Sequence, residues 1–431
     1  MRRGVTAKVV LAIAGVLLAG LPAVAEGPPV EVAWRNTIKH PADSQRLLVD
    51  PASGDVVAVT APTNDAVQVV RRLDGRTGKV QWTAEVPGWM TDLAVHPASG
   101  RVVLAGKEAA GVRVVVLDAG GAVVWQRLTS GETLVGLAVD PVSGRVCTVG
   151  RSGRRRAGSE TWFTSCWTLD GAEVFADAWV PPEGPSQAND IAIDPRTHRI
   201  YVVGTSRPVE RLTEKGQDVV LLAYEPEGRM AWTARSAGAV RVSFYDIGLD
   251  PARHRVYLLG EPYYSNYPMR LFAYSASGRK VFVKRWRDED HVDESELAIT
   301  SSGGVLAVSA NNHHATMRSY SVTGRLLSSG RVPIADRDAW GGLPDVAIDQ
   351  RRQRVYVVND ESGVDHTTSL YVFAFDRRLL SRSVVDRAKP VPPQYPSVDS
   401  SIVFDAASGR VLVASTLSED PGRHRITAFT S

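Results

Sequence analysis

The sequence has almost no excess of charge of either sign. Its 431 residues include 50 Lys and Arg against 47 Asp and Glu, which gives a formal net charge of +3. A chain this close to neutrality has no general field that would attract a polyanion or a membrane surface, so we do not expect nucleic acid as a partner. Its content of 44% hydrophobic and 23% charged residues is otherwise that of an ordinary globular protein.

The sequence also lacks an apolar run long enough to span a membrane at its N-terminus. The run from Val9 to Leu21 is shorter than the roughly 20 residues that a helix needs to cross a hydrocarbon core. Basic residues precede it and the small residues Ala23 to Ala25 follow it, which is the pattern of a secretory signal peptide. We therefore expect residues 1–25 to be a signal peptide cleaved after Ala25, no transmembrane anchor, and a secreted mature chain, extracellular or in the cell envelope.

Cysteine is scarce, with only Cys147 and Cys166 in the chain. In an oxidising compartment an even number of cysteines favours a disulfide. Aligned on another repeat of this sequence, the two cysteines match Val103 and Val114, which we expect to be cross-strand partners at a spacing that a disulfide can bridge. The alternative is two free, buried thiols that act as small hydrophobic side chains.

Catalytic signatures are missing as well. The sequence contains no Gly-x-Ser-x-Gly nucleophile elbow, no His-Glu-x-x-His zinc motif and no Cys-x-x-Cys-His haem site. No linear motif therefore identifies a nucleophile, a metal or a cofactor.

What the chain does contain is an internal repeat. Eight segments share one pattern of an apolar strand followed by a turn, as in Leu93-Ala-Val-His-Pro-Ala-Ser-Gly100 and Leu137-Ala-Val-Asp-Pro-Val-Ser-Gly144. The fourth residue of the pattern falls at positions 50, 96, 140, 194, 250, 300, 349 and 405. A second apolar run follows each turn at once, so each copy predicts a β-hairpin. Where the turn reads Asp-Pro-x-Ser-Gly, we expect the Gly to take a positive φ.

Two further strands complete each repeat. A third apolar run follows, and then a Gly turn and a fourth strand that carries an aromatic four residues after the Gly, as in Gly78 to Trp82 and Gly121 to Trp125. Four antiparallel strands every 44 to 56 residues, with no credible helix, are typical of β-propeller blades. We predict an all-β, eight-bladed β-propeller that forms one domain over residues 26–431, and we expect the recurring Trp residues to pack between blades.

The two ends of the chain predict how the propeller closes. The eighth copy stops after its third strand, Arg425 to Phe429, and so lacks a fourth. The mature N-terminus supplies Val30-Glu-Val-Ala-Trp34, with Trp34 in the position of the other outer-strand aromatics. We therefore expect the N-terminal strand to complete the last blade and leave no open sheet edge at the junction.

These repeats resemble known families. Leu73-Asp-Gly-Arg-Thr-Gly-Lys-Val-Gln-Trp82 is similar to the repeat of quinoprotein-like eight-bladed propellers, and Ile191-Ala-Ile-Asp-Pro195 with Tyr201-Val-Val-Gly204 resembles the repeats of secreted bacterial propellers of the YVTN and SBBP kind. The quinoprotein resemblance would imply pyrroloquinoline quinone, a calcium ion and a disulfide between adjacent cysteines. Because the two cysteines here are nineteen residues apart, we do not expect the quinone, and the resemblance that remains is to non-enzymatic propellers that bind partner proteins.

Polar loops predict a site for a divalent cation. Connections from an outer strand to the next inner strand, and from second to third strands, emerge at the same end of a blade, where binding residues concentrate. Carboxylates bind calcium, and histidines suit zinc. The candidate metal ligands on these loops are Asp290, His291, His313, His314, Asp365 and His366. The alternative is a solvated acidic loop beside unrelated histidines.

A second candidate site is a set of acidic residues that begin the innermost strands, namely Asp92, Asp190, Asp246, Glu296, Asp345 and Asp399. Grouped at a channel mouth, they would bind a cationic ligand. Alternatively, each carboxylate accepts backbone N–H groups from an adjoining loop.

Two functions follow from these predictions. The first is a secreted, monomeric, non-catalytic scaffold that presents a loop-rich face to a protein, a polymer or a small ligand. The second is a propeller enzyme of the hydrolase, lyase or lactonase type, which uses the histidine cluster with carboxylates. Enzymes on this fold assemble sites from single residues of several blades, so the missing motifs do not decide between the two.

Overall fold

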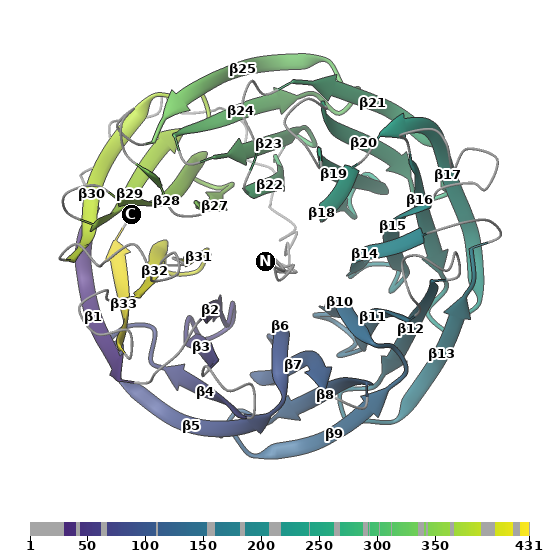
Figure 1. The fold of residues 1–431 in the computed structure, drawn as a ribbon, viewed down its shortest axis with the longest axis horizontal. Helices are drawn as coiled ribbons and strands as arrows, with labels where there is room; N and C mark the ends of the chain where they lie inside the picture. Colours follow the sequence, from purple (N-terminus) through teal and green to yellow (C-terminus); the bar gives the residue numbers. More distant parts are fainter. Residues whose placement is uncertain are drawn as a thin grey trace. The chain divides into compact units, whose positions relative to one another are not determined.

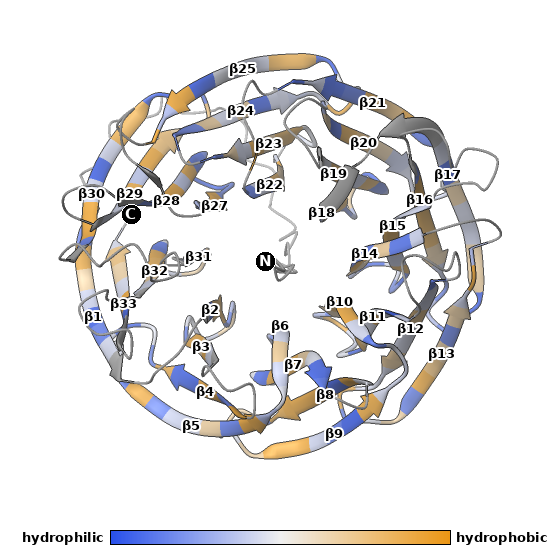
Figure 2. Ribbon diagram, viewed as in Figure 1, coloured by the Kyte–Doolittle hydropathy of each residue, from blue (hydrophilic) through white to orange (hydrophobic). Residues whose placement is uncertain are grey.

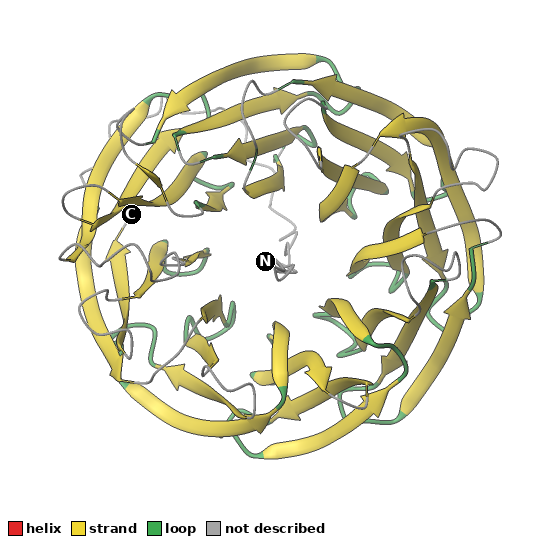
Figure 3. Ribbon diagram, viewed as in Figure 1, coloured by secondary structure: helices red, strands yellow, loops and turns green. Residues whose placement is uncertain are grey.

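Every regular element in the described part of the chain is a β-strand (Figure 3). The computed structural model describes residues 30–39, 44–61, 67–108, 111–152, 160–181, 186–206, 217–240, 242–262, 268–287, 292, 294–300, 302–311, 313–334, 340–341, 344–362, 366–388, 401–416 and 423–430. Within these ranges no helix could cross a membrane. The predicted signal peptide and its cleavage site lie outside the described residues.

The strands form eight antiparallel sheets, which we number as blades 1 to 8 in the order of their inner strands (Figure 1). Contacts divide the chain into two compact units, and each unit contains four blades. One unit contains blades 2 to 5 and spans Val86–His291, and the other contains blades 6, 7, 8 and 1.

The first unit has four regular blades. Blade 2 consists of β6 (Trp89–His96), β7 (Arg101–Glu108), β8 (Gly111–Leu117) and β9 (Val123–Thr129). Blade 3 consists of β10 (Thr133–Val139), β11 (Val146–Ser152), β12 (Thr161–Trp167) and β13 (Glu173–Trp179). Blade 4 consists of β14 (Ser186–Ile193), β15 (Ile200–Ser206), β16 (Gln217–Tyr224) and β17 (Met230–Val240). Blade 5 consists of β18 (Val242–Asp250), β19 (Arg255–Pro262), β20 (Met269–Ser275) and β21 (Lys280–Trp286).

The second unit includes the first and the last strands of the described chain. Blade 6 consists of β22 (Glu294–Ile299), β23 (Val305–Ala310), β24 (His314–Tyr320) and β25 (Leu326–Pro333). Blade 7 consists of β26 (Trp340–Gly341), β27 (Asp345–Asp349), β28 (Arg354–Ser362), β29 (His366–Ala374) and β30 (Leu379–Ala388). Blade 8 consists of β31 (Ser401–Asp405), β32 (Arg410–Thr416), β33 (Arg423–Thr430) and β1 (Glu31–Lys39). Blade 1 consists of β2 (Ser44–Val49), β3 (Val56–Ala61), β4 (Val67–Leu73) and β5 (Val80–Pro87).

The predicted fold class and the predicted closure are both confirmed. The N-terminal strand β1 pairs with β33 along its whole length, from Glu31 opposite Thr430 to Lys39 opposite Arg423. Blade 7 differs in one detail, because its inner strand is split into β26 and β27, which both pair with β28. Pro344 directly precedes β27 and has no N–H to donate to the ladder, which accounts for a break at this point.

The disulfide is present, and it joins directly opposed residues of β11 and β12. Cys147 and Cys166 are paired in the ladder with Cα atoms 4.2 Å apart. The residue of blade 2 that corresponds to Cys166 is Val116, which lies opposite Val103. The sequence alignment to Val114 was therefore wrong by two residues, because Val114 pairs with Ala105 instead.

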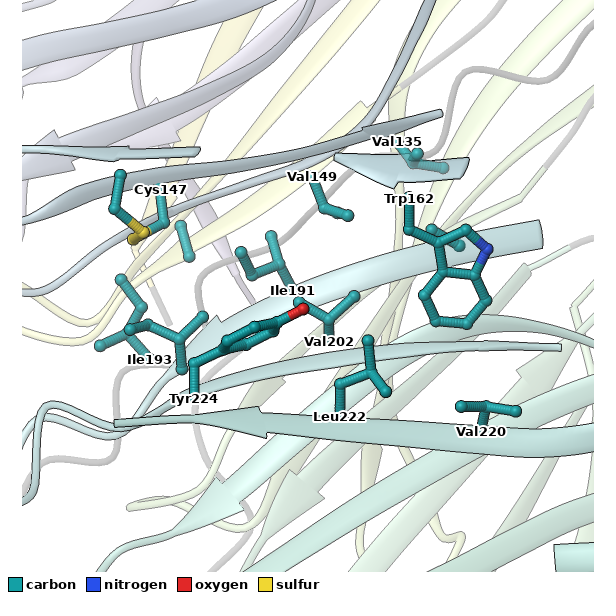
Figure 4. Close-up of a cluster of buried hydrophobic side chains, with 14 residues drawn as sticks. Val135, Cys147, Val149, Trp162, Ile191, Ile193, Val202, Val220, Leu222 and Tyr224 are labelled. Carbon is teal, nitrogen blue, oxygen red and sulfur yellow. A yellow bond between two sulfur atoms is a disulfide. The ribbon is translucent and has the colours of Figure 1, made fainter. Parts of the chain in front are cut away.

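Apolar side chains of neighbouring blades meet in shared cores. In the core between blades 3 and 4, Cys147, Cys166 and Trp162 pack with Ile191 and Tyr224 (Figure 4). Strands covered on both faces carry the nearly continuous apolar runs seen in the sequence, because each inner face contacts another blade. Figure 2 shows the same runs as orange segments along the strands.

In four blades the aromatic of the outer strand packs on a turn of the next blade. Trp34 of blade 8 covers Gly78 of blade 1, where a Cβ would lie 2.4 Å from the indole ring and where φ is +70°. Only glycine combines that φ with that contact. The same packing joins Trp125 to Gly171, Phe175 to Gly228 and Trp232 to Gly278. The prediction that the recurring Trp residues pack between blades is confirmed for these pairs.

An arginine that the sequence analysis did not single out strengthens this packing. Trp125 Nε1 and Arg101 NH1 of blade 2 both donate to the carbonyl of Leu169 in blade 3, at 2.9 and 3.1 Å. The same shared acceptor recurs twice, with Trp232 and Arg199 on Ala276, and with Trp34 and Arg410 on Gly75. One carbonyl thus holds two side chains of the preceding blade, and the last of these three contacts ties both ends of the chain to blade 1.

The two units differ in their inner strands. In blades 2 to 5 each inner strand has a β-bulge near its start, and the residue before the bulge pairs with a glycine of the second strand, as Met90 pairs with Gly106. A Cβ on Gly106 would lie 2.0 Å from the carbonyl oxygen of Trp89, so only glycine fits there. In blades 1, 6, 7 and 8 the corresponding residues are Thr60, Ser309, Asn359 and Ser415, all buried.

Candidate functional site

One end of each blade varies and the other is nearly constant. The hairpin turns between first and second strands, and between third and fourth strands, are short, as at 97–100 and 118–122. Connections between second and third strands lie at the opposite end and range from residues 109–110 in blade 2 to residues 207–216 in blade 4. Variation confined to one end is typical of a binding surface on a conserved scaffold.

The side chains of four of the six predicted metal ligands lie outside the described residues. Asp290, His291 and Asp365 lie outside the described residues, and His366 begins β29 with its side chain outside them. His313 and His314 are described, with their rings 6.3 Å apart. The part of the chain that the structure describes contains no group of three or more His, Cys, Asp or Glu that could hold a metal ion. The cation site stays a prediction.

Of the two described histidines, His313 lies in the turn between β23 and β24, and His314 begins β24. The side chain of Asn311 accepts the backbone N–H groups of His313 and His314, at 2.9 and 2.8 Å. The carbonyl of His313 accepts the N–H of Ile334, whose own carbonyl accepts the buried side chain of Asn359 in blade 7. Asn311 thus fixes the conformation of this turn, and Ile334 connects it to the next blade.

Three of the predicted inner-strand carboxylates clamp neighbouring blades together. Each accepts the N–H of the residue after it with one oxygen and an N–H of the next blade with the other. Asp92 accepts Leu93 and Leu137, both at 2.8 Å. Asp345 accepts Val346 and Ile402, at 2.8 and 2.9 Å. These contacts support the structural alternative for both residues, while their role in ligand binding stays a prediction.

Asp190 makes the same clamp in a more buried setting. It accepts the N–H of Ile191 at 2.7 Å and a backbone hydrogen bond from Ile247 of blade 5. Desolvation raises the pKa of Asp190 to about 7, against the opposing effect of these two hydrogen bonds. The surrounding strands β10, β14, β15 and β18 contain no Lys, Arg or His. No cation of these strands is therefore available to stabilise the ionised carboxyl.

The remaining predicted acidic residues are Asp246, Glu296 and Asp399. Asp246 is buried directly after the bulge of β18, and Glu296 is half-buried in β22. Blade 3 has Gly136 in this position, where a Cβ would lie 3.1 Å from a carboxylate oxygen of Asp190. Asp399 lies outside the described residues.

The inner hairpins hold a second set of buried carboxylates, at the fourth position of the repeat pattern. Asp140 accepts Val142 N–H and Ser143 Oγ, and His198 Nδ1 of blade 4 lies 2.6 Å from it. His198 occupies the glycine position of its hairpin, with a φ of +57°. His96 replaces the aspartate in blade 2, and burial lowers its pKa although the nearby Asp140 carboxylate opposes that shift. Asp140 thus stabilises its own turn through Val142 and Ser143, and it contacts the next blade through His198.

Comparison with known proteins shows similarity of fold alone. Neither a protein-family model nor a curated protein matches the sequence. Among solved structures, the C-terminal WD40 domain of Sif2 is similar with a TM-score of 0.57 and 10% identity, over 94% of this chain and 98% of that one. The Dos1 propeller is similar with a TM-score of 0.58 and 10% identity, over 93% of this chain and 95% of that one. The chain is thus similar in fold to solved β-propellers.

Proposed function

We propose that this protein is an exported, non-catalytic binding propeller that presents the variable ends of its blades to a partner. The observation that carries the proposal is the contrast between the two ends of each blade. Turns at one end are uniform and hold buried carboxylates, whereas connections at the other end differ in length from blade to blade. A scaffold selected for recognition keeps its turns uniform at one end and varies the connections at the other end.

Two features support export. The buried disulfide between Cys147 and Cys166 is of the kind that persists in oxidising compartments. The first 25 residues have the pattern of a signal peptide. The resemblance of the repeats to secreted YVTN, SBBP and quinoprotein-like propellers agrees with both features, and a single domain over residues 26–431 with a monomeric state is part of the same proposal.

Site-specific photo-crosslinking in the producing cells tests the proposed binding end. A photoreactive residue at position 211, in the longest connection between second and third strands, should give a discrete adduct. The matched control is the same residue at Val142, an exposed position in the inner hairpin of blade 3, which should give none. Adducts at Val142 with none at position 211, or equal adducts at both, would refute the proposal.

A further inference from the structure

The near-neutral net charge hides a local excess of cations on the outer strand of blade 5. Strand β21 and its two flanking residues carry Arg279, Lys280, Lys284, Arg285 and Arg287. Neither β21 nor its neighbour β20 contains an Asp or a Glu. All but the half-buried Lys284 are exposed, and blue segments mark part of this strand in Figure 2.

Two of these five cations contact another described side chain. Lys280 Nζ donates to Ser236 Oγ of blade 4 at 3.0 Å, and the ammonium of Lys284 lies 5.7 Å from the Phe282 ring. Among described residues, Arg279, Arg285 and Arg287 form no ion pair. No acidic side chain of the described residues neutralises these three charges; the acidic residues Asp288, Glu289 and Asp290, which follow Arg287 in the sequence, lie outside the described residues.

A like-charge pair in the same blade adds to the excess. Arg270 of β20 lies directly opposite Arg285. Burial and, to a lesser extent, the Arg285 charge lower the pKa of Arg270 to about 10. Like charges directly opposite each other destabilise a sheet. Arg270 therefore adds positive charge beside β21.

Protection of an exposed sheet edge does not explain the run of cations. Charged residues on edge strands prevent pairing with other chains. However, outer strand β9 of blade 2 exposes Val123, Val124 and Leu128 and carries Arg127 as its only charge. Outer strand β13 of blade 3 carries two acidic residues and no basic one. The density of cations on β21 is thus higher than on either of these outer strands. Outer strand β30 of blade 7 is also basic, with Arg382 and Arg387, but unlike β21 it contains an acidic residue, Asp386.

We propose that β21 and its flanking residues bind a linear polyanion, a polymer with phosphate or carboxylate groups repeated along its length. The extent of the surface favours a polymer over a single ion. From Arg279 to Arg287 an extended strand covers about 26 Å at roughly 3.3 Å per residue, enough for several successive anionic groups. This surface lies on the outer strand and does not depend on the proposed function of the loop-bearing ends.

Binding of labelled polyphosphate at several salt concentrations tests the proposal. Counterion release predicts that log K falls with log[salt] with a slope of about −3 for four to five contacted phosphates. Replacement of Arg279, Lys284, Arg285 and Arg287 by Gln should weaken binding at least tenfold and remove most of the slope. Lys280 is left in place because of its bond to Ser236. Polygalacturonate, tested in parallel, distinguishes a preference for phosphate from one for carboxylate.

The matched control removes the same charge elsewhere. Replacement of the exposed residues Arg76, Lys79, Lys107 and Arg325 by Gln should leave the affinity within about twofold. If the quadruple variant in blade 5 melts early, single Arg285→Gln and Arg287→Gln variants should each weaken binding severalfold. The proposal is overturned if polyphosphate does not bind, if the control loses as much affinity, or if orthophosphate at equal phosphate concentration competes as well as the polymer.

Discussion

At the scale of single residues, contacts between blades depend on backbone groups shared between side chains. The carbonyl of Leu169 accepts both Trp125 and Arg101, so each donor contributes a hydrogen bond and together they keep the acceptor satisfied. A carbonyl left without any partner in a packed interface costs more than either bond contributes.

A double-mutant cycle tests this shared acceptor. Trp125→Phe and Arg101→Gln should each lower the free energy of unfolding by about 1 kcal/mol, and the double variant should lose more than their sum because Leu169 then lacks both donors. Urea unfolding measures the free energy of unfolding of the wild type, of each single variant and of the double variant. The matched cycle uses Phe175→Leu and Arg145→Gln in blade 3, where the outer-strand aromatic has no N–H to share an acceptor, and should be additive. Strict additivity in the first cycle would disprove the coupling.

The buried carboxyl of Asp190 predicts a dependence of stability on pH. Its pKa rises from 3.8 to about 7 on folding, so between these values the folded state holds a proton that the unfolded state has lost. The free energy of unfolding should therefore fall as pH rises from about 4 to about 7, and this contribution should be flat outside that window. Asp190→Asn should remove the slope, as urea unfolding at several pH values can show. Asp345→Asn is the control, because Asp345 makes the same pair of backbone hydrogen bonds but is only half-buried. A constant difference between wild type and Asp190→Asn across the window would contradict the prediction.

At the scale of the strand, the bulges of blades 2 to 5 depend on the glycines opposite them. Gly106→Ala would place a Cβ 2.0 Å from Trp89 O and 2.4 Å from Met90 Cα, both backbone atoms that cannot rotate away. We expect it to lower the melting temperature by the equivalent of about 3 kcal/mol or more. Ser309→Ala, at the corresponding position of blade 6, should cost about 1 kcal/mol. Equal effects would mean that the bulge adapts to a side chain.

The disulfide should stabilise blade 3 by restricting the unfolded chain. It closes a loop of 19 residues, for which about 3 kcal/mol is expected. Replacement of both cysteines by Val reproduces the Val103 and Val116 pair of blade 2 and so preserves the packing. Unfolding free energies of this variant and of the reduced wild type should agree with each other and lie about 3 kcal/mol below the oxidised protein. A loss of less than about 1 kcal/mol would assign the disulfide no stabilising role.

Periodic features of the sequence predicted the blades, and features that depend on the neighbouring blade were missed. Strand order follows from an apolar pattern repeated eight times, and the positive φ of the turn glycines follows from the turn residues of individual copies. The pairing of Cys147 with Cys166 follows from their places in neighbouring strands of one repeat. The bulges could not be predicted in this way, although Gly106, Gly150, Gly204 and Gly260 recur at the positions opposite them. Packing decides which backbone segment approaches a glycine, and the sequence pattern does not show it. The arginine after the inner hairpin recurs in six repeats, at Arg101, Arg145, Arg199, Arg255, Arg354 and Arg410, and this signal could have been found.

The predicted sites illustrate the same division. The positions of Asp92, Asp190 and Asp345 followed from the strand pattern, but their role depends on which N–H group of the next blade faces them. Residues outside the repeated pattern, such as His291 and Asp365, have no repeat to fix their location, so the sequence could not bring them together.

At the scale of the whole molecule, the account depends on the pairing of β1 with β33. Thr37 lies opposite Arg425 in this pair, and Arg35 lies two residues away in register. The most direct measurement is disulfide formation between introduced cysteines, mapped by mass spectrometry of peptides. Thr37→Cys with Arg425→Cys should form a bridge in the folded protein, whereas Arg35→Cys with Arg425→Cys should not. No bridge in the first variant, or equal bridging in both, would contradict closure of the last blade by the N-terminal strand.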